Sequence, residues 1–393
     1  MKRSNTTTKS LPIVLSTGCI YILYLLIAIE STVTSTLLPD IMQCYALSLS
    51  SIGFLTAIQS AGQLVSALLG ILIADRFNKR KASALIVLLF SISLIGLGTK
   101  PVYPIVLFLF FIRGMGISLS TVYFNAMISD IYQSKRNIYI NYLHIFYGVG
   151  SSLGPLASAL FFSHALSWNH IYTLIGICCV CAVLIHTGFA QNMSALSVSV
   201  HPKADTEPGQ PDSHPFNYQI LFLGILMFCY NGHQVSMNNW IPTYLSNAYS
   251  VTSKTGALAL SFYWGSVLIG RFLYNVLFSK TRDKTYIFFS CLITGFIMLF
   301  GILSSQVWIF MLCLILGGIT TGAVYPLLFS LACSTLPTNS AFANSVLSAC
   351  GQLGGLLFTW LIGIAAQYIS FLFAFLLIIG LLLVIPFMLG LKK

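Results

Sequence analysis

One carboxylic acid stands inside a long apolar stretch of this chain. Eight residues are acidic, and of these only Glu30 lies well within such a stretch. An ionised carboxylate surrounded by hydrocarbon is unstable, so we expect Glu30 to spend part of its time protonated. A group of this kind can carry a proton across a membrane. The alternatives are a structural ion pair with Arg113 or Arg271, or hydrogen bonds to neighbouring Thr and Ser side chains.

Two arginines also lie inside apolar stretches, Arg113 before Gly114 and Arg271 after Gly270. An arginine at the centre of a membrane helix costs about 2.5–3.5 kcal/mol on insertion scales, unless it is paired or faces a wet cavity. Arg113 would avoid this cost by extending its side chain to the membrane surface, and both interpretations stay open. We expect both arginines to act as gating residues.

Amide and aromatic side chains gather in a later apolar stretch, residues 230–244, which contains Asn231, Gln234, Trp240 and Tyr244. Amides both donate and accept hydrogen bonds, and aromatic faces can cover the C–H faces of a sugar ring. A polar uncharged solute therefore fits this stretch better than a lipophilic drug. The alternative is hydrogen bonding between helices, together with a Trp–Tyr belt at the membrane surface. We favour the belt for Trp240 and Tyr244.

Helices that cross a membrane must position these side chains. Only 7% of the residues are charged and 57% are hydrophobic, whereas a soluble domain carries about 25% charged residues. Apolar runs near 20 residues recur along the chain, and each can cross roughly 30 Å of hydrocarbon. The sequence predicts an all-α membrane protein with twelve transmembrane helices. Their approximate ranges are 11–38, 51–74, 82–99, 102–131, 138–163, 170–190, 217–245, 255–278, 285–304, 306–332, 339–367 and 370–390.

The basic residues predict how these spans are oriented. The formal charge of +11 comes mostly from Lys and Arg in the termini and in alternate connections, whereas the opposite connections hold only Lys100 and Lys254. Positive residues concentrate on the cytoplasmic side of membrane proteins. We therefore expect a multi-pass protein of the plasma membrane (the inner membrane of a bacterium), with both termini in the cytoplasm. The distribution argues against nucleic-acid binding, and we expect a monomer whose partner is the lipid bilayer.

The chain is predicted to consist of two pseudo-symmetric six-helix bundles. We expect an N-terminal bundle over residues 1–190, a cytoplasmic linker over 191–216 and a C-terminal bundle over 217–393. An offset of 203 residues relates matching positions in the two halves. The matched pairs are Pro39 and Pro242, Gly114 and Gly317, Asn141 and Asn344, and Gly148 and Gly351. Parallel repeats of this kind place a substrate site between the halves, near the middle of the membrane.

No pattern in the chain predicts an enzyme or a cofactor. The ten cysteines lie mostly as single residues in apolar spans, without the paired spacing of a zinc site or a disulfide framework. We interpret them as small buried hydrophobes. The sequence contains no metal triad, nucleophile elbow or phosphate loop, and the missing Gly-x-x-x-x-Gly-Lys-Ser/Thr run excludes an ATP-driven pump.

The connection at residues 71–81 resembles a loop signature of the major facilitator superfamily, an Asp-Arg pair followed by basic residues. Asp75 and Arg76 match the pair, whereas both glycines of the signature are replaced. Residues 111–116, an arginine followed by glycines, resemble a second signature. The resemblance implies that Asp75, Arg76 and Arg80 belong to a cytoplasmic gate. The alternative is that these charges only set the topology.

A closer resemblance is to the fucose permease-like branch of sugar transporters, through Asn125, residues 141–150 and residues 322–326. The two membrane carboxylates of that branch fall on Ser35 and Thr121 here. The coupling residues are therefore not carried over, and Glu30 is the candidate replacement. The resemblance and the polar stretch together predict the substrate contacts. These are Asn125, His144, Tyr147, Asn231, Gln234, Trp264 and Tyr325.

These observations predict a secondary active transporter that works by alternating access. The leading hypothesis is proton symport of a small polar solute, above all a sugar, with Glu30 as the proton carrier. The nearest alternative is a proton-coupled exporter of drugs or metabolites, because residues 150–155 partly match an antiporter signature of the superfamily. Close helix packing by small residues explains those residues equally well. A membrane-bound enzyme or a sensor is the remaining alternative.

Overall fold

Helices make up the regular structure of the residues that the structure describes. The computed structural model describes residues 11–73, 78–132, 136–163, 167–191, 218–278, 280–336 and 340–391. In chain order the elements are α1 (Leu11–Cys44), α2 (Leu49–Ile73), α3 (Lys79–Gly98), α4 (Tyr103–Ile131), α5 (Arg136–Ser163), α6 (Trp168–Gln191), α7 (Tyr218–Tyr249), α8 (Ser253–Leu273), the π-helical turn η3 (Tyr274–Phe278), α9 (Asp283–Leu303), α10 (Val307–Thr321), α11 (Val324–Thr335), α12 (Ser340–Tyr368) and α13 (Phe371–Leu391).

Twelve helical rods are long enough to cross a membrane in the described part of the chain. α10 and α11 form one rod because only two residues separate them, and α8 continues directly into η3. Eleven of the rods are also strongly apolar. The twelfth, α5, is less apolar because polar and small residues interrupt its sequence. The predicted all-α fold with twelve transmembrane helices is confirmed.

α1 extends further than the sequence predicts. The predicted span ends at residue 38, whereas α1 continues through Pro39 to Cys44. Proline has no N–H and usually kinks or ends a helix. Membrane helices tolerate it, because neighbouring groups can satisfy the carbonyl that it leaves free. Pro242 occupies the matching place inside α7, so the same feature occurs in both halves.

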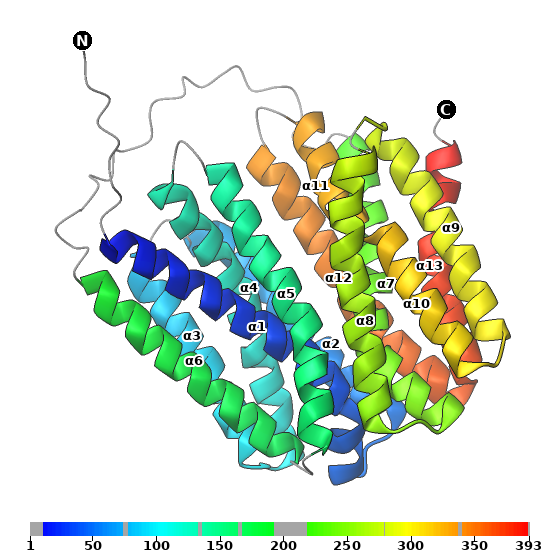
Figure 1. The fold of residues 1–393 in the computed structure, drawn as a ribbon, viewed down its shortest axis with the longest axis horizontal. Helices are drawn as coiled ribbons and strands as arrows, with labels where there is room; N and C mark the ends of the chain where they lie inside the picture. The colour runs from blue at the N-terminus through cyan, green and yellow to red at the C-terminus, as the bar shows by residue number, and fades with distance from the viewer. Residues whose placement is uncertain are drawn as a thin grey trace.

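The helices form two groups of six that meet along a common boundary. In Figure 1, α1–α6 lie mainly on the left and α7–α13 on the right. Across the boundary α2 packs against α12, α5 packs against α8, and α1 packs against α7. The second span of each half thus meets the fifth span of the other half, as a two-fold relation requires. The two six-helix halves are therefore pseudo-symmetric, as predicted.

One hydrogen bond lies near the axis that relates the two halves. Asn238 Nδ2 donates to Ser35 Oγ over 2.7 Å, and these residues are 203 positions apart. That separation equals the offset between the repeats. Two residues that a two-fold axis exchanges can touch each other only near the axis, so this bond supports the repeat register. The linker expected over 191–216 lies outside the described residues apart from Gln191, and the domain limits stay a prediction.

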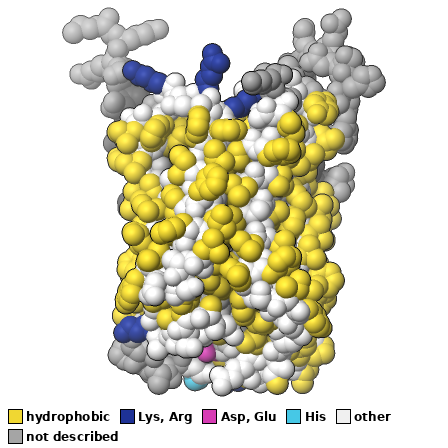
Figure 2. Space-filling model, turned by 90° about the vertical axis from the view of Figure 1, so that its right-hand side faces the viewer, with side chains coloured by type: hydrophobic (Ala, Val, Ile, Leu, Met, Phe, Trp, Pro, Cys, Tyr) yellow, Lys and Arg dark blue, Asp and Glu magenta, His cyan; other side chains and the backbone are white. Residues whose placement is uncertain are grey.

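Hydrophobic side chains cover the flank of the molecule, as expected of a protein surrounded by lipid. Figure 2 shows this apolar flank, with Lys and Arg side chains gathered mainly at the upper end. α1 begins and α13 ends at that same end (Figure 1). We call it the basic end, and it includes the starts of α3 and α9 with their lysines Lys79 and Lys284. The other end, where α1 stops and α2 begins, is the opposite end.

Candidate functional site

The two most deeply placed charges form an ion pair inside the N-terminal half. Arg113 Nε on α4 donates to Glu30 Oε1 on α1 over 2.5 Å, and both side chains are fully buried. Arg113 Nη1 also donates to Gln59 Oε1 on α2 over 2.7 Å. Each charge offsets the desolvation of the other, so the pair is tolerated where one charge alone would not be. Of the two environments considered for Arg113, the structure has the paired one.

A short chain of hydroxyl groups leads away from this ion pair. Thr34 Oγ1 donates to Glu30 Oε1 over 2.8 Å, and the Tyr172 hydroxyl of α6 lies 3.0 Å from Thr34 Oγ1. Oε1 of Glu30 therefore accepts from both Thr34 and Arg113. Glu30 Oε2 is buried without a hydrogen-bond partner among the described residues. Oε2 is thus the oxygen that can accept a proton without displacing a donor.

A second group of side chains lies at the boundary between the halves. The Tyr24 ring on α1 lies 4.9 Å from the Tyr147 ring and 6.1 Å from the His144 ring, both on α5. Arg271 on α8 lies within electrostatic range of all three, and of Tyr325 on α11. Tyr24 is buried, His144 is exposed and the other three are half-buried. We call these five residues the boundary cluster.

The boundary cluster brings together three of the predicted substrate contacts, His144, Tyr147 and Tyr325, and one predicted gating residue, Arg271. Tyr147 also links the cluster to the buried ion pair. Its hydroxyl is within hydrogen-bonding range of Ser31, and it lies in the electrostatic range of both Glu30 and Arg113. The boundary cluster and the buried ion pair are therefore neighbours.

An interruption between α10 and α11 holds Arg271 in place. Pro326 has no N–H, so the carbonyl four residues earlier, that of Gly322, loses its partner within the helix. Arg271 Nε donates to this carbonyl over 3.0 Å. The Tyr230 hydroxyl on α7 donates to the preceding carbonyl, that of Thr321, also over 3.0 Å. Side chains from two other helices thus satisfy the backbone at the interruption.

Within the described part of the chain, three other predicted substrate contacts make no hydrogen bond or ring contact with the boundary cluster. Asn231 Nδ2 on α7 donates to the Gly351 carbonyl of α12 over 2.7 Å. Asn125 Nδ2 donates to the Thr121 carbonyl of its own helix over 2.8 Å. Gln234 is buried on α7. The bond of Asn231 joins two helices of one half, which is the interhelical role that was left open for residues 230–244.

The remaining predicted contact, Trp264, belongs to a polar network that joins the two halves. Its Nε1 donates to Asn238 Oδ1 over 2.8 Å. Asn238 donates to Ser35, and Ser35 Oγ lies 3.1 Å from Asn239 Oδ1, to which it donates. The contact of Ser35 with Asn238 and Asn239 was not predicted from the sequence. The offset of 203 residues, which pairs Ser35 with Asn238, is the signal that could have found it.

Between the Ser35 network and the opposite end, the two halves also meet through close packing of α2 and α12. A Cβ atom added to Gly53 would lie 3.2 Å from the Cα atom of Gly363. The backbone N–H of Ser50 donates to Gln367 Oε1 over 2.9 Å. On the symmetry-related side, a hydrogen bond of 2.6 Å joins Ser261 Oγ on α8 to the backbone carbonyl of α5 residue Ser152. The described hydrogen bonds between the halves therefore lie from mid-helix to the opposite end.

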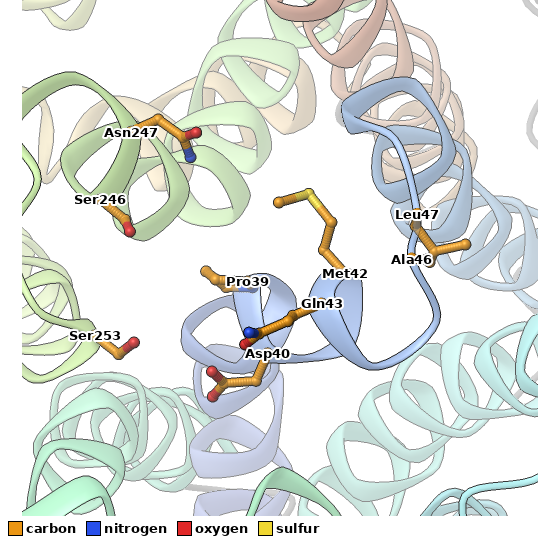
Figure 3. A pocket seen from close by; sticks show the side chains of 9 residues that line it. All are labelled: Pro39, Asp40, Met42, Gln43, Ala46, Leu47, Ser246, Asn247 and Ser253. Atoms are coloured by element: carbon orange, nitrogen blue, oxygen red, sulfur yellow. The ribbon is translucent and has the colours of Figure 1, made fainter.

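A pocket opens at the opposite end, beyond the Ser35 network. Figure 3 shows Asp40 and Gln43 at the end of α1, with Asn247 of α7 and Ser253 of α8 across from them. The full lining is Pro39, Asp40, Met42, Gln43, Ala46, Leu47, Ser246, Asn247 and Ser253. Along α1 the order is Tyr24, Ser35 and then Asp40, so the Ser35 network separates this pocket from the boundary cluster.

The predicted gate is only partly described. Asp75 and Arg76 lie outside the described residues, and Arg80 is half-buried near the start of α3. Beside it, Lys79 Nζ forms an ion pair with Asp130 Oδ2 of α4 at 2.8 Å. This pair ties α3 to α4 at the basic end.

The glycines of residues 150–155 pack α5 onto α1. A Cβ atom on Gly150 would lie 2.5 Å from the Leu25 carbonyl oxygen, and one on Gly154 would lie 2.5 Å from that of Ile29. Such distances are far below van der Waals contact, so only glycine permits this approach. These residues could belong to an antiporter signature or serve close helix packing, and the contacts of Gly150 and Gly154 with α1 support packing.

Comparison with known proteins gives the family. The family model for the Major Facilitator Superfamily matches residues 20–300, well over half of the chain. The Protein TsgA homolog of Yersinia pestis (strain Pestoides F) is 21% identical over 346 residues, which cover 86% of this chain and 84% of that protein.

Solved structures share the fold. A bacterial homolog of the human lysosomal transporter Spinster, in an inward-facing and unoccupied conformation, has a TM-score of 0.76 at 15% identity, with 97% of both chains covered. The nucleoside transporter NupG has a TM-score of 0.74 at 14% identity, with 96% of this chain and 99% of that chain covered. The chain therefore belongs to the Major Facilitator Superfamily, and it is an integral multi-pass membrane transporter rather than an enzyme.

Proposed function

We propose that this transporter is a proton symporter that carries a small polar, sugar-like solute by alternating access. One observation carries the proposal. The buried ion pair of Glu30 and Arg113, with one carboxylate oxygen left without a donor, lies beside the boundary cluster through Tyr147. A proton-binding group and a solute-binding group that are neighbours can influence each other.

Glu30 carries the proton in this mechanism. A proton on Oε2 neutralises the carboxylate, so its bond to Arg113 loses the attraction between opposite charges. Arg113 keeps its bond to Gln59 and remains charged. Because Tyr147 lies within range of both members of the ion pair and of Arg271, the change in charge reaches the boundary cluster.

The solute binds at the boundary cluster. Hydroxyl, imidazole and guanidinium groups supply hydrogen bonds to a polar solute, and the rings of Tyr24 and Tyr147 supply apolar faces for its C–H groups. The resemblance to the fucose permease-like branch, which includes His144 and Tyr147, supports a sugar-like solute. Asn125, Asn231, Gln234 and Trp264 stay predicted contacts outside this cluster.

The packing of the halves supports a state in which the solute path leads to the basic end. The hydrogen bonds that join the halves lie between mid-helix and the opposite end. Alternating access then requires these contacts to separate while others form at the basic end. Asp75, Arg76 and Arg80 are assigned to that second step.

The basic end is assigned to the cytoplasm, because Lys and Arg gather there and cytoplasmic connections are rich in both. A fluorescent protein that matures only in the cytoplasm, fused after Lys393, is expected to fluoresce in bacterial cells. A dark fusion that is nevertheless inserted in the plasma membrane would reverse this assignment.

Uptake into proteoliposomes tests the symport proposal. The labelled solutes are D-galactose, D-glucose and D-glucuronate, each supplied with and without an inward proton gradient. Wild-type protein is expected to accumulate at least one of them only with the gradient. Glu30→Gln is expected to lose this accumulation but keep exchange of the same solute without a gradient, which shows that it is folded. Asp130→Asn removes an ion-paired carboxylate of the same half and serves as the control.

Two outcomes would reject the proposal. Accumulation that ignores the gradient, or that persists in Glu30→Gln, removes the proton-carrying role. Loss of a preloaded solute when the proton gradient is applied would instead indicate the proton-coupled exporter.

A further inference from the structure

We propose that the solute carries a negative charge, and that the guanidinium of Arg271 binds its carboxylate. The proposal rests on the proposed solute site and narrows its substrate class from sugar-like solutes to hydroxylated organic acids, such as sugar acids. The observation behind it is a positive charge at the boundary cluster that no described carboxylate offsets.

The charges of Glu30, Arg113 and Arg271 add up to one net positive charge inside the membrane-spanning part of the molecule. Glu30 and Arg113 offset each other in one buried pair. Arg271 has no ion pair within the described residues, whose ion pairs are those of Arg113 with Glu30 and of Lys79 with Asp130. One positive charge therefore remains at the boundary between the halves. A cation within a membrane-spanning segment is expected to face a partner or water, and a bound anion would supply that partner.

The geometry leaves the outer edge of the Arg271 side chain available. Nε is committed to the Gly322 carbonyl, which Pro326 leaves without its helical donor. This bond fixes the guanidinium plane, while its two terminal nitrogens form no hydrogen bond among the contacts of the described residues. A carboxylate can accept from the two terminal nitrogens side by side, which is the arrangement that arginine favours over lysine.

The neighbours of Arg271 suit a hydroxylated acid better than a simple inorganic anion. Tyr24, Tyr147 and Tyr325 present phenol groups within electrostatic range of the guanidinium, and His144 presents an imidazole. These groups donate and accept hydrogen bonds and can therefore engage hydroxyl groups. Their rings also cover C–H faces, which a sugar acid has and phosphate lacks.

Charge recognition at Arg271 also links binding to closure of the site. When the halves close over an empty site, Arg271 would be withdrawn from water without a counter-charge, which is unfavourable. When they close over a bound carboxylate, the guanidinium and the solute form a neutral pair. The loaded transporter would therefore close more readily than the empty one.

Thermal unfolding of the purified protein tests this inference. The probes are matched pairs that differ by one carboxylate, D-glucuronate with D-glucose and D-galacturonate with D-galactose. The protein is held in phosphatidylcholine nanodiscs, which offer no net anionic headgroup. At least one acid is expected to raise the unfolding midpoint of the wild type by several degrees, and its neutral partner is not. A second arm with phosphatidylglycerol nanodiscs shows whether a lipid anion competes for the same guanidinium.

Three variants separate recognition of charge from a merely structural role. Arg271→Gln is expected to lose the shift caused by the acid relative to its own unliganded midpoint. Arg271→Lys keeps the charge without the planar fork, and its apparent affinity for the acid is expected to fall about tenfold. Lys254→Gln removes one positive charge from the exposed start of the same helix, and it is expected to respond as the wild type does. Since wild type and Arg271→Lys both retain the charge, the test does not depend on Arg271→Gln folding.

The inference is overturned if no acid shifts the midpoint, if the neutral sugars shift it equally, or if the shift survives in Arg271→Gln. It is also overturned if only phosphatidylglycerol gives an Arg271-dependent shift, because the anion would then be a lipid. Gradient-driven uptake of a neutral sugar that depends on Glu30 would meanwhile keep the symport proposal. The two failures are therefore distinguishable.

Discussion

Glu30 and Arg113 are both buried away from water, where a single unpaired charge would be unstable. Each charge offsets the desolvation cost of the other. Removal of one member of a buried ion pair leaves an uncompensated charge, which typically costs about 3–5 kcal/mol. Replacement of both members by glutamine leaves two uncharged amides that can hydrogen-bond to each other. The stability cost of these two buried charges therefore appears only when the pair is broken.

Three variants at the ion pair are expected to differ in stability. Glu30→Gln and Arg113→Gln should each lower the free energy of unfolding, the former by about 3–5 kcal/mol because charged Arg113 stays buried without its counter-charge. The double variant should recover most of that loss. Denaturant unfolding in detergent micelles measures all three.

A matched control is the ion pair of Lys79 and Asp130, whose side chains are 29% and 59% exposed. Lys79→Gln should change stability by less than about 1 kcal/mol, because water screens an exposed pair. If Glu30→Gln is as stable as the wild type, or the double variant loses the sum of the single losses, the ion pair does not have the proposed energetics.

Residue types alone predicted part of this site. A single carboxylate and two arginines in apolar spans are conspicuous, so Glu30, Arg113 and Arg271 could be found from the sequence. Which arginine pairs with Glu30 could not, because the pairing depends on how α1, α2 and α4 pack. Asn231 donates to the Gly351 carbonyl, and its contact with solute stays a prediction. An amide in a membrane helix serves either role, and the sequence does not show which face it occupies.

At the scale of elements, a helix interruption and a glycine contact shape the boundary between the halves. The interruption at α10 and α11 presents a free carbonyl that orients Arg271. The glycine contact of α2 with α12 lets the two backbones touch near the opposite end. The proline and the glycines were visible in the sequence, but the tenth span was predicted as one continuous helix. Pro326 lies only two residues inside α11, where a proline is compatible with helix, so the sequence signal was ambiguous.

A bulky side chain at the contact between Gly53 and Gly363 should favour the conformation in which the opposite end is open. A Cβ on Gly363 would lie 2.7 Å from the Leu49 carbonyl oxygen and 3.2 Å from the Cα of Gly53. Gly363→Leu is therefore expected to separate α2 from α12 and favour opening of the opposite end. Spin labels on Cys44 and on a cysteine introduced by Ala248→Cys, with Cys178 and Cys181 replaced by alanine, should report a longer distance between these two positions.

Gly380→Leu is the control for this substitution. It makes the same substitution in α13, where an added Cβ atom meets nothing within 4 Å. The distance between the two spin labels should match that in the labelled protein without the Gly363→Leu substitution. If Gly363→Leu also leaves the distance unchanged, the contact of α2 with α12 does not hold the opposite end closed.

At the scale of the whole molecule, the two-fold relation organises both the fold and the proposed mechanism. Twelve spans, two halves and their register could be predicted, because hydrophobic length and repeat offset are properties of sequence alone. Which end is packed could not, because both conformations of an alternating-access protein share one sequence. Ser35 and Asn238, which the offset relates and a hydrogen bond joins, lie near the axis about which we expect the halves to move.

A crosslink across the opposite end tests alternating access most directly. Ser50 and Gln367 are joined there by a hydrogen bond of 2.9 Å between the halves. The variant Ser50→Cys/Gln367→Cys, in which the exposed native residues Cys44, Cys178 and Cys181 are replaced by alanine, should lose solute uptake into proteoliposomes after treatment with a short bis-methanethiosulfonate reagent, which forms a reducible disulfide with each introduced cysteine. Reduction of the crosslink should restore it, and each variant that carries only one of the two introduced cysteines should stay active after the same treatment. If the fully crosslinked protein still transports, the opposite end does not need to open, and transport by alternating access of these two halves is contradicted.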